Sequence, residues 1–142
     1  MVYIFDENDI LWASFKLRYL IKSKLQNKLN DYDITLDQWI ILSLIYQKEG
    51  TNQKNLAEIS NKDRAVITRI LNKLENKGLI ERKNSHHDKR EFLIYLTDEG
   101  NGLYSETAAL MHQNAQEIKS YFSDSEMGQF KSLLNKLSSN LE

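Results

Sequence analysis

The sequence predicts a mainly α-helical protein with one small β-hairpin, arranged as a winged helix-turn-helix with helices on both sides. Between residues 52 and 100 a short helix, a longer helix and a basic hairpin follow one another without a gap. Residues 61–90 carry nine basic and four acidic side chains, a net charge of +5, which leaves −6 for the rest of the chain. In this layout one helix enters a DNA major groove and the hairpin tip lies beside the phosphate backbone or the minor groove. A basic patch on an acidic body has the charge distribution of a DNA-binding surface.

Length and composition narrow the possible classes of protein. With 142 residues the chain is the size of one domain. The absence of cysteine excludes disulfides, thiolate metal sites and cysteine-based redox sensing. There is no apolar run of membrane-spanning length, and the first nine residues carry three acids and no base, unlike a signal peptide. We therefore expect a cytoplasmic protein without a membrane partner.

Two helices are predicted before the basic segment. Apolar residues recur at helical spacing from Asp9 to about Leu29, with basic residues between them. Asn30–Asp33 is typical of a loop, Thr35 is a good N-cap for the second helix, and Gly50 is expected to end it.

The central segment contains the predicted recognition helix. A short helix over Gln53–Ser60 is followed by a longer one over Asp63–Asn76, which stops before Gly78. On a helical wheel the apolar side chains of the longer helix gather on one side. Those residues are Val66, Ile67, Ile70, Leu71 and Leu74. On the opposite side lie Ala65, Thr68, Arg69 and Asn72.

The polar side of this helix is suited to reading bases. Arginine and asparagine form bidentate hydrogen bonds with guanine and adenine edges, and Ala65 and the Thr68 methyl group suit a thymine methyl. Any solvated amphipathic helix, however, would show small and polar residues on its outer face. Lys73 is better placed for a phosphate. Thr51, Asn52 and Gln53 are expected to hold phosphate at the start of the preceding helix, although plain helix capping explains the same residues.

The hairpin is predicted over Ile80–Leu96. Phe92, Ile94 and Leu96 alternate with their neighbours at the period of a strand, and a charged loop precedes them. Arg90 on this loop suits a narrow A·T-rich minor groove, where negative potential is concentrated. We expect Asp88 to brace Arg90 through a charge-assisted hydrogen bond.

The C-terminal part is predicted to form two further helices. Thr97 is a good N-cap for a helix running to about Tyr121, and Ser123 with Glu126 forms a capping box for the last helix. Apolar residues of the last helix alternate at spacings of three and four, as in a short helix–helix seam. They are Met127, Phe130, Leu134, Leu137 and Leu141. The terminal helices carry more apolar surface than one small module needs, which favours a dimer.

Five motifs in this order resemble the multiple-antibiotic-resistance regulator (MarR) family. They are Leu56-Ala57-Glu58, Val66-Ile67-Thr68-Arg69-Ile70-Leu71, Leu74-Glu75-Asn76-Lys77-Gly78-Leu79-Ile80-Glu81-Arg82, Asp88-Lys89-Arg90 and Leu96-Thr97-Asp98-Glu99-Gly100. Motif-level similarity covers residues 35–102, and the flanking helices fit the family in length and order. The resemblance implies a cytoplasmic transcription regulator, usually a repressor, that binds double-stranded DNA at a pseudo-palindromic operator as a homodimer.

The resemblance also implies how the single domain, 1–142, is divided and which residues meet DNA. Residues 1–34 and 99–142 would be dimerisation helices, and 35–98 the winged helix-turn-helix region. Carried over by position, Ala65, Thr68, Arg69 and Asn72 would face the major groove, Arg90 the minor groove, and Asp88 would be the brace of the wing. The whole set predicted to bind DNA is Thr51, Asn52, Gln53, Arg64, Ala65, Thr68, Arg69, Asn72, Lys73, Asp88 and Arg90.

Family members often release DNA when a small, commonly phenolic, anion binds between the winged module and the dimerisation helices. The residues that we expect to line such a pocket are Trp12, Phe15, Tyr19, Trp39, Tyr46, Tyr104 and Met111. Aromatic residues at helical spacing are more often part of a hydrophobic core, and that alternative stays open.

Other classes of function find less support. His86, His87 and Asp88 look like a metal trio but belong to the solvent-facing hairpin, and His112 stands alone, so we expect no metal and no cofactor. No phosphate-binding glycine loop, catalytic triad order or zinc-protease motif occurs, so an enzyme is not expected. A dimeric winged-helix module that binds a protein partner is opposed by the basic segment. A cryptic enzyme would need a polar pocket that the sequence does not reveal.

Overall fold

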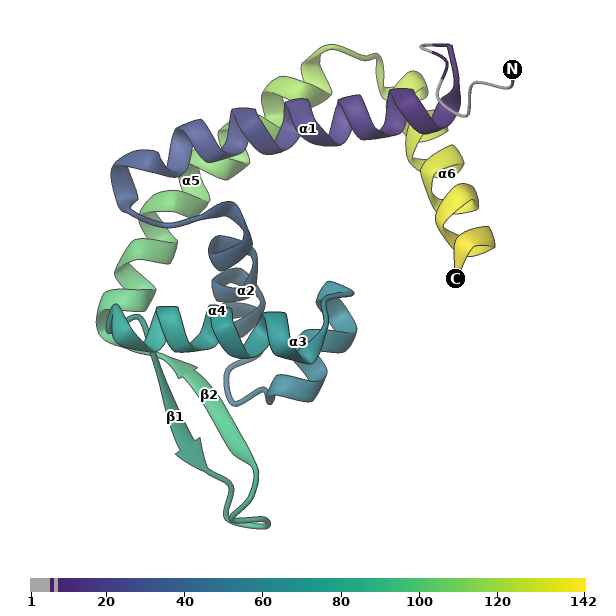
Figure 1. The fold of residues 1–142 in the computed structure, drawn as a ribbon. Coiled ribbons are helices and arrows are strands. Elements are labelled where there is room, and N and C mark those ends of the chain that lie inside the picture. The colour runs from purple at the N-terminus through teal and green to yellow at the C-terminus, as the bar shows by residue number, and fades with distance from the viewer. Residues whose placement is uncertain (1–5, 7) are drawn as a thin grey trace. The chain divides into compact units, whose positions relative to one another are not determined.

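The computed structural model describes residues 6 and 8–142 and consists of helices with one two-stranded antiparallel sheet (Figure 1). The elements in chain order are α1 (Ile10–Leu29), the short 3₁₀ helix η1 (Asn30–Tyr32), α2 (Leu36–Gln47), α3 (Gln53–Ser60), α4 (Arg64–Asn76), β1 (Ile80–Asn84), β2 (Phe92–Leu96), α5 (Asp98–Ser120) and α6 (Asp124–Leu141). The chain divides into two compact units, Met1–Thr107 and Ala108–Glu142, each described by itself below. The predicted fold class, mainly helical with a hairpin wing, is confirmed. The predicted division at residues 34/35 and 98/99 stays a prediction.

The core of the first unit forms around α2, which contacts α1, α3, α4 and β2. α2 begins with a complete capping box, in which Thr35 and Gln38 each bond the backbone N–H of the other. Fully buried leucine and isoleucine side chains from four elements meet here. They are Leu29, Ile41, Leu42, Ile45, Leu56, Ile67, Leu71 and Leu74. Burial of this apolar surface is the main stabilising contribution to the helix-turn-helix.

The hairpin pairs β1 with β2 in one register, with Ile80 opposite Leu96 and Asn84 opposite Phe92. At its base, Gly50 and Thr51 bond both polar backbone groups of Ile94, as Gly50 N–H to Ile94 C=O (2.9 Å) and Ile94 N–H to Thr51 C=O (2.8 Å). This contact explains why α2 already ends at Gln47: the chain turns through Gly50, at φ +78°, to reach β2.

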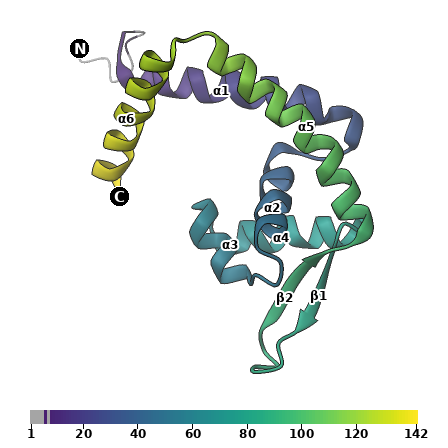
Figure 2. The same cartoon turned by 180° about the vertical axis from the view of Figure 1, so that it is seen from behind.

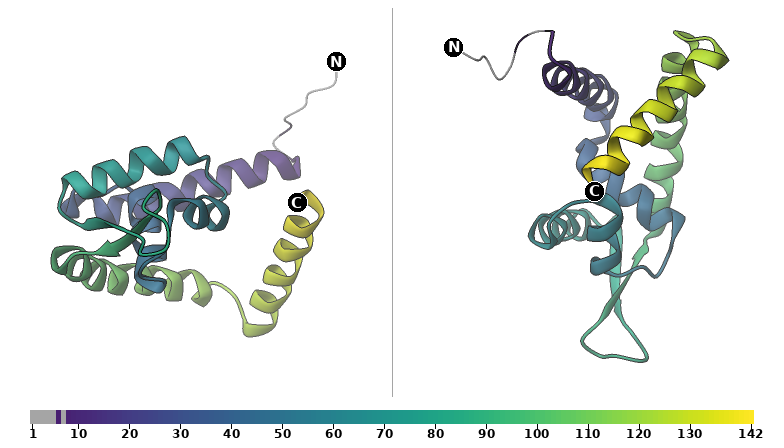
Figure 3. Two further views of the ribbon diagram at one scale, coloured as in Figure 1. Left: turned by 90° about the horizontal axis from the view of Figure 1, so that it is seen from below. Right: turned by 90° about the vertical axis from the view of Figure 1, so that its right-hand side faces the viewer.

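The far part of the hairpin projects away from the helices, and the right-hand view of Figure 3 shows its loop standing clear of them. We call residues 80–96 the wing. The expected alternation in β2 is confirmed for Ile94 and Leu96, which are buried, but Phe92 is 52% exposed. Phe92 is the first residue of β2, directly after the wing loop.

A tight corner joins the wing to α5 (Figure 2). Thr97 donates its hydroxyl to the Gly78 carbonyl oxygen (2.6 Å) and accepts from the backbone N–H of Gly100 (3.1 Å), as expected of an N-cap. A Cβ at Gly100 would lie 2.0 Å from the Leu79 carbonyl oxygen, closer than any side chain can come. Glycine at position 100 therefore lets the first turn of α5 pack directly on the backbone that enters β1.

The second unit contains the last part of α5 and the whole of α6. The predicted capping box at Ser123 and Glu126 is present, with both reciprocal hydrogen bonds at 3.0–3.1 Å. The rings of Phe122 and Phe130 stack with their centroids 5.9 Å apart. No residue of α6 is buried.

Candidate nucleic-acid interface

Helix α4 presents the expected face. Ile67, Leu71 and Leu74 are fully buried, which turns the polar side of the helix outward. On that side Ala65, Arg69 and Asn72 are exposed and Thr68 is half-buried. The burial of this helix therefore matches the helical wheel derived from the sequence, and contact of its exposed face with DNA stays a prediction.

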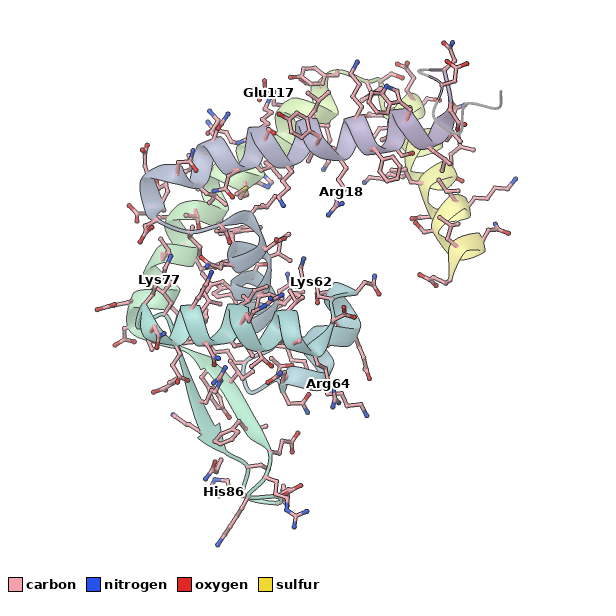
Figure 4. All side chains as sticks on the ribbon, in the orientation of Figure 1. Arg18, Lys62, Arg64, Lys77, His86 and Glu117 are labelled. Atoms are coloured by element: carbon pink, nitrogen blue, oxygen red, sulfur yellow. The ribbon has the colours of Figure 1, made fainter. Side chains whose placement is uncertain are left out.

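A groove of about 700 Å³ lies between the start of α4 and the wing. Its walls come from α3, α4, both strands of the wing and the wing loop. The lining residues are Asn52, Gln53, Lys54, Arg64, Thr68, Arg82, Asp88, Arg90, Glu91, Phe92 and Ile94. Four of these are basic and two are acidic, so the groove carries a net positive charge, as contact with a phosphate backbone requires. Figure 4 shows Arg64 at the start of α4.

Gln53 holds the two helices of the helix-turn-helix together. Its amide nitrogen donates to the carbonyl oxygen of Arg64 (3.2 Å) and to the hydroxyl of Thr68. The Thr68 hydroxyl in turn donates to the Arg64 carbonyl oxygen (2.9 Å). Both side chains are thus already engaged within the protein, which leaves the methyl group of Thr68 as the part suited to a thymine methyl.

Asn52 connects the first turn of α3 to the wing. Its side-chain oxygen caps the helix by accepting from Asn55 N–H (2.8 Å), and its amide nitrogen donates to a Glu91 carboxylate oxygen (2.5 Å). The capping alternative considered for Asn52 is therefore present in the structure. Its amide group lies in the wall of the groove, where a phosphate contact remains a prediction.

Thr51 departs from the expected placement. Its side chain is only 2% exposed, because the backbone of this residue pairs with Ile94 of β2 and is covered there. The expectation that Thr51, with Asn52 and Gln53, holds phosphate through backbone amides and side chains stays a prediction.

The wing loop is braced differently from the expectation. One Asp88 carboxylate oxygen accepts from the backbone N–H of Arg90 (2.9 Å), so the brace acts on the main chain and not on the guanidinium group. Arg90 is exposed and lines the groove. His86 lies at the tip of the wing (Figure 4).

Arg82 is a residue of the groove to which sequence reasoning assigned no role. From β1 it donates to the side-chain oxygen of Asn72 (3.0 Å), and its Nε lies 3.7 Å from a Glu75 carboxylate oxygen. Arg82 therefore orients an amide on the exposed face of α4. Arg82 belongs to the basic segment identified in the sequence. Only the path of β1 in the structure shows that this residue faces α4.

Arg69 and Lys73 line a separate groove of about 440 Å³, bounded by α1, α2 and α4. The exposed face of α4 thus has two flanks. Arg64 and Thr68 adjoin the wing groove, whereas Arg69 and Lys73 adjoin the groove beside α1 and α2.

The aromatic residues predicted to line an effector pocket lie in different places. Tyr104 stacks on Tyr46 (centroids 4.1 Å apart) and on Trp39 (6.1 Å), and the Trp39 indole N–H donates to the Thr107 hydroxyl (2.8 Å). Trp12 borders a shallow groove of about 430 Å³ along α1, where Phe15 and Tyr19 are also exposed. Met111 is buried in the second unit. The structure brings three of the seven residues into one stack, and binding of an effector stays a prediction.

Within residues 6 and 8–142, no cluster of three or more histidine, aspartate or glutamate side chains is arranged to hold a metal ion. In the same part of the chain no helix is long and apolar enough to cross a membrane.

The comparisons with known proteins agree with this geometry. The family model described as "MarR family" matches residues 34–92. The chain is 27% identical over 135 residues to the HTH-type transcriptional regulator YybA of Bacillus subtilis, covering 95% of this chain and 90% of that protein. It superposes on S. aureus MepR in a DNA complex with a TM-score of 0.90 at 27% identity, covering 97% of this chain and 100% of that one. A mutant of E. coli MarR complexed with operator DNA gives a TM-score of 0.84, again at 27% identity, over 96% and 99% of the two chains.

A two-helix unit followed by a basic wing, with an exposed polar face on the second helix, defines a winged helix-turn-helix DNA-binding protein. The relatives and structural neighbours are transcription regulators and not enzymes. Residues 34–92 match the MarR family model, and over nearly its whole length the chain is similar to DNA-binding transcription regulators of the MarR type.

Proposed function

We propose that this protein is a homodimeric repressor that binds a pseudo-palindromic operator with two winged modules. We further propose that a small aromatic or anionic effector releases it from DNA. The observation that carries the DNA-binding part is the basic groove between α4 and the wing, where Lys54, Arg64, Arg82 and Arg90 come together from three elements and the wing loop. Because the ligand would be genomic DNA, we propose that the protein is located in the cytoplasm.

Exposed apolar side chains support the homodimer. α1 exposes large apolar residues around its whole circumference, which is typical of a helix buried in an assembly. They are Ile10, Leu11, Trp12, Phe15, Leu17, Leu20 and Ile21. On α6 the corresponding residues are Phe130, Leu133, Leu134, Leu137 and Leu141. Exposed apolar surface on this scale marks an interaction site, and in this family the natural occupant is a second copy of the chain.

Two winged modules related by a twofold axis would require two half-sites in inverted orientation, about 10 bp apart from centre to centre. Repression is the activity that the resemblance to MarR implies. The stack of Trp39, Tyr46 and Tyr104 supports the effector proposal, since flat aromatic surfaces favour a flat aromatic ligand.

The first test is selection of short duplexes from random DNA, followed by measurement of affinity against salt concentration. We expect an enriched inverted repeat and a steep decrease in affinity with salt, because each neutralised phosphate releases counterions. Absence of any enriched sequence, with only weak salt-sensitive attraction, would contradict the operator and favour the protein-partner alternative.

The effector is tested with hydroxybenzoates as the probe. Titration into the protein–duplex complex is followed by tryptophan fluorescence and by release of the duplex. We expect quenching and release at the same concentration, and Tyr104→Leu is expected to weaken both. Release that is unchanged in this variant would remove the aromatic stack from the proposal.

A further inference from the structure

The hydrogen bonds of Gln26, which we call the joint, connect α1 to the start of α2. The side chain of Gln26, near the end of α1, accepts from the backbone N–H of Leu36 (2.8 Å) and donates to the carbonyl oxygen of Ile34 (3.2 Å) and to the side chain of Asn30 (3.1 Å). Ile34 and Leu36 are themselves buried, so Gln26 satisfies backbone groups that have little access to water. Leaving such groups unpaired costs about 1–3 kcal/mol each. Gln26 therefore fixes the direction in which α1 leaves the core.

The same short linker is held from the side of the recognition helix. Lys77, just after α4, donates to the backbone carbonyl oxygen of Asp33 and lies 3.7 Å from its carboxylate (Figure 4). Its ammonium group is also 3.4 Å from the side-chain oxygen of Gln38. Asp33 itself has a left-handed backbone conformation, with φ at 51°. α1 and the end of α4 are thus bonded to one linker, from Asn30 to Leu36.

A second, weaker connection runs parallel to the joint. The Asp37 carboxylate lies 3.1 Å from Lys62, in the turn between α3 and α4, and 3.9 Å from Lys22 on α1. Lys22 and Asp37 are about half exposed, so this ion pair contributes little on its own. The directional hydrogen bonds of Gln26 act in addition to the packing of α1 on α2 to fix the orientation of α1 relative to α4.

The geometry of α1 turns this local constraint into a long-range one. From Gln26 to Ile10 the helix spans 16 residues, or about 24 Å at a rise of 1.5 Å per residue. A rotation of about 10° at the joint would move the far end by about 4 Å, which is close to the axial rise of one base pair, 3.4 Å. If α1 carries dimer contacts, the joint determines how far apart two recognition helices lie.

We propose that Gln26 is a positioning residue that sets the spacing between half-sites accepted by the dimer. This inference rests on the proposed function, because it needs a dimer and a two-part operator. Gln26 contacts no DNA in this arrangement and acts through the orientation of α1.

The test compares Gln26→Leu, which has a similar size but no polar group, with Gln26→Glu, which keeps only the acceptor for Leu36 N–H. Asn27→Ala, at the exposed neighbouring position, is the control. The full-length proteins are titrated with duplexes in which the selected half-sites are separated by the preferred spacing or by one or two base pairs more or fewer. A duplex with a single half-site measures recognition itself.

We expect the wild type and Asn27→Ala to prefer one spacing by at least about tenfold. Gln26→Leu should reduce that preference to about threefold or less and leave the affinity for the single half-site unchanged, with Gln26→Glu in between. A Gln26→Leu variant that retains the full preference, or that weakens all duplexes equally, would overturn the inference. Should Gln26→Leu fail to fold, Gln26→Glu decides: a spacing preference clearly below that of the wild type supports the inference, and the full wild-type preference overturns it.

The outcome for the wild type separates this inference from the proposed function. A wild type that selects an inverted repeat of fixed spacing supports the function, and the Gln26 variants then test the inference alone. A wild type that selects no DNA removes the function and this inference with it.

Discussion

Helices α4 and α6 have similar apolar periodicity but opposite environments. In α4 the apolar face is buried against its neighbours α2, α3 and β1, and Leu71 and Leu74 are fully buried. In α6 the apolar face stays open, and Leu133 is 64% exposed and Leu141 78%. The difference shows that periodicity identifies an apolar face but not what covers it. α4 completes its packing within one chain, whereas α6 leaves its apolar surface open.

The largest effect is expected where the packing around the winged core is closest. Gly100→Ala should destabilise the protein by about 3 kcal/mol or more, because the new Cβ would lie 2.0 Å from the Leu79 carbonyl oxygen and the backbone must move. Gly102→Ala is the matched control, since no atom lies within 4 Å of its Cβ position. That variant should stabilise α5 by about 0.5–1 kcal/mol, the helix propensity difference. Urea denaturation measures the free energy of unfolding of both variants, and equal values for the two would contradict the close approach at position 100.

The next effect tests the open face of α6. Leu134→Asp should raise the dissociation constant of the proposed dimer by about thirtyfold, or about 2 kcal/mol, because a charge would be buried in the proposed interface. The core of the first unit should keep its circular dichroism spectrum. Light scattering over a dilution series measures the change, and Leu137→Asp should behave similarly. A mass that stays dimeric at every concentration in both variants would place the interface elsewhere.

The third effect concerns a side chain that belongs to neither apolar face. Arg90→Ala should weaken binding to the selected operator by about 1–3 kcal/mol and leave the denaturation midpoint unchanged. The physical reason is that Arg90 is exposed and braced only through its backbone by Asp88. Lys119→Ala, at an exposed site outside the groove, is the control. Full affinity of the Arg90 variant would exclude the wing loop from the mechanism.

The smallest effect is expected at the start of α6. Ser123→Ala removes the N-cap and should destabilise this helix by about 1 kcal/mol, seen as faster hydrogen exchange in its first turn. The backbone N–H and then the hydroxyl of Ser123 lower the pKa of Glu126 from its ordinary value of 4.5. The contribution of this carboxylate is therefore complete above pH 4.5 and is lost as the pH falls through the lowered pKa. An NMR titration of the Glu126 carboxyl group should show its pKa rising in the variant, and an unchanged pKa would contradict this account.

Much of the fold could be predicted from the sequence because the signals were local. The bounds of α3, the capping residues Thr35 and Ser123, and the start of α5 at Thr97 depend on neighbours within one turn of a helix. The exposed face of α4 was also predictable, since a strong 3.6-residue period leaves little choice of buried side.

The site was less predictable because its connections join residues far apart in the sequence. Gln26 bonds a linker eight to ten residues away, Lys77 bonds a loop 44 residues earlier, and Asn52 bonds Glu91 across 39 residues. Such pairs leave no periodic signal in one sequence. The burial of Thr51 was unpredictable for the same reason: the pairing of its backbone with Ile94 depends on how the wing returns to the core.

That pairing has a further consequence for how the protein avoids self-association through its sheet. β2, with the sequence Phe-Leu-Ile-Tyr-Leu, is an apolar strand of the kind that adds readily to other strands. Its outer edge is occupied at Ile94 by the backbone of Gly50 and Thr51, while β1 on the other side carries Glu81, Arg82 and Lys83. One edge is capped by the chain's own backbone and the other is charged, so the wing can carry an apolar strand into solvent without becoming a template for aggregation.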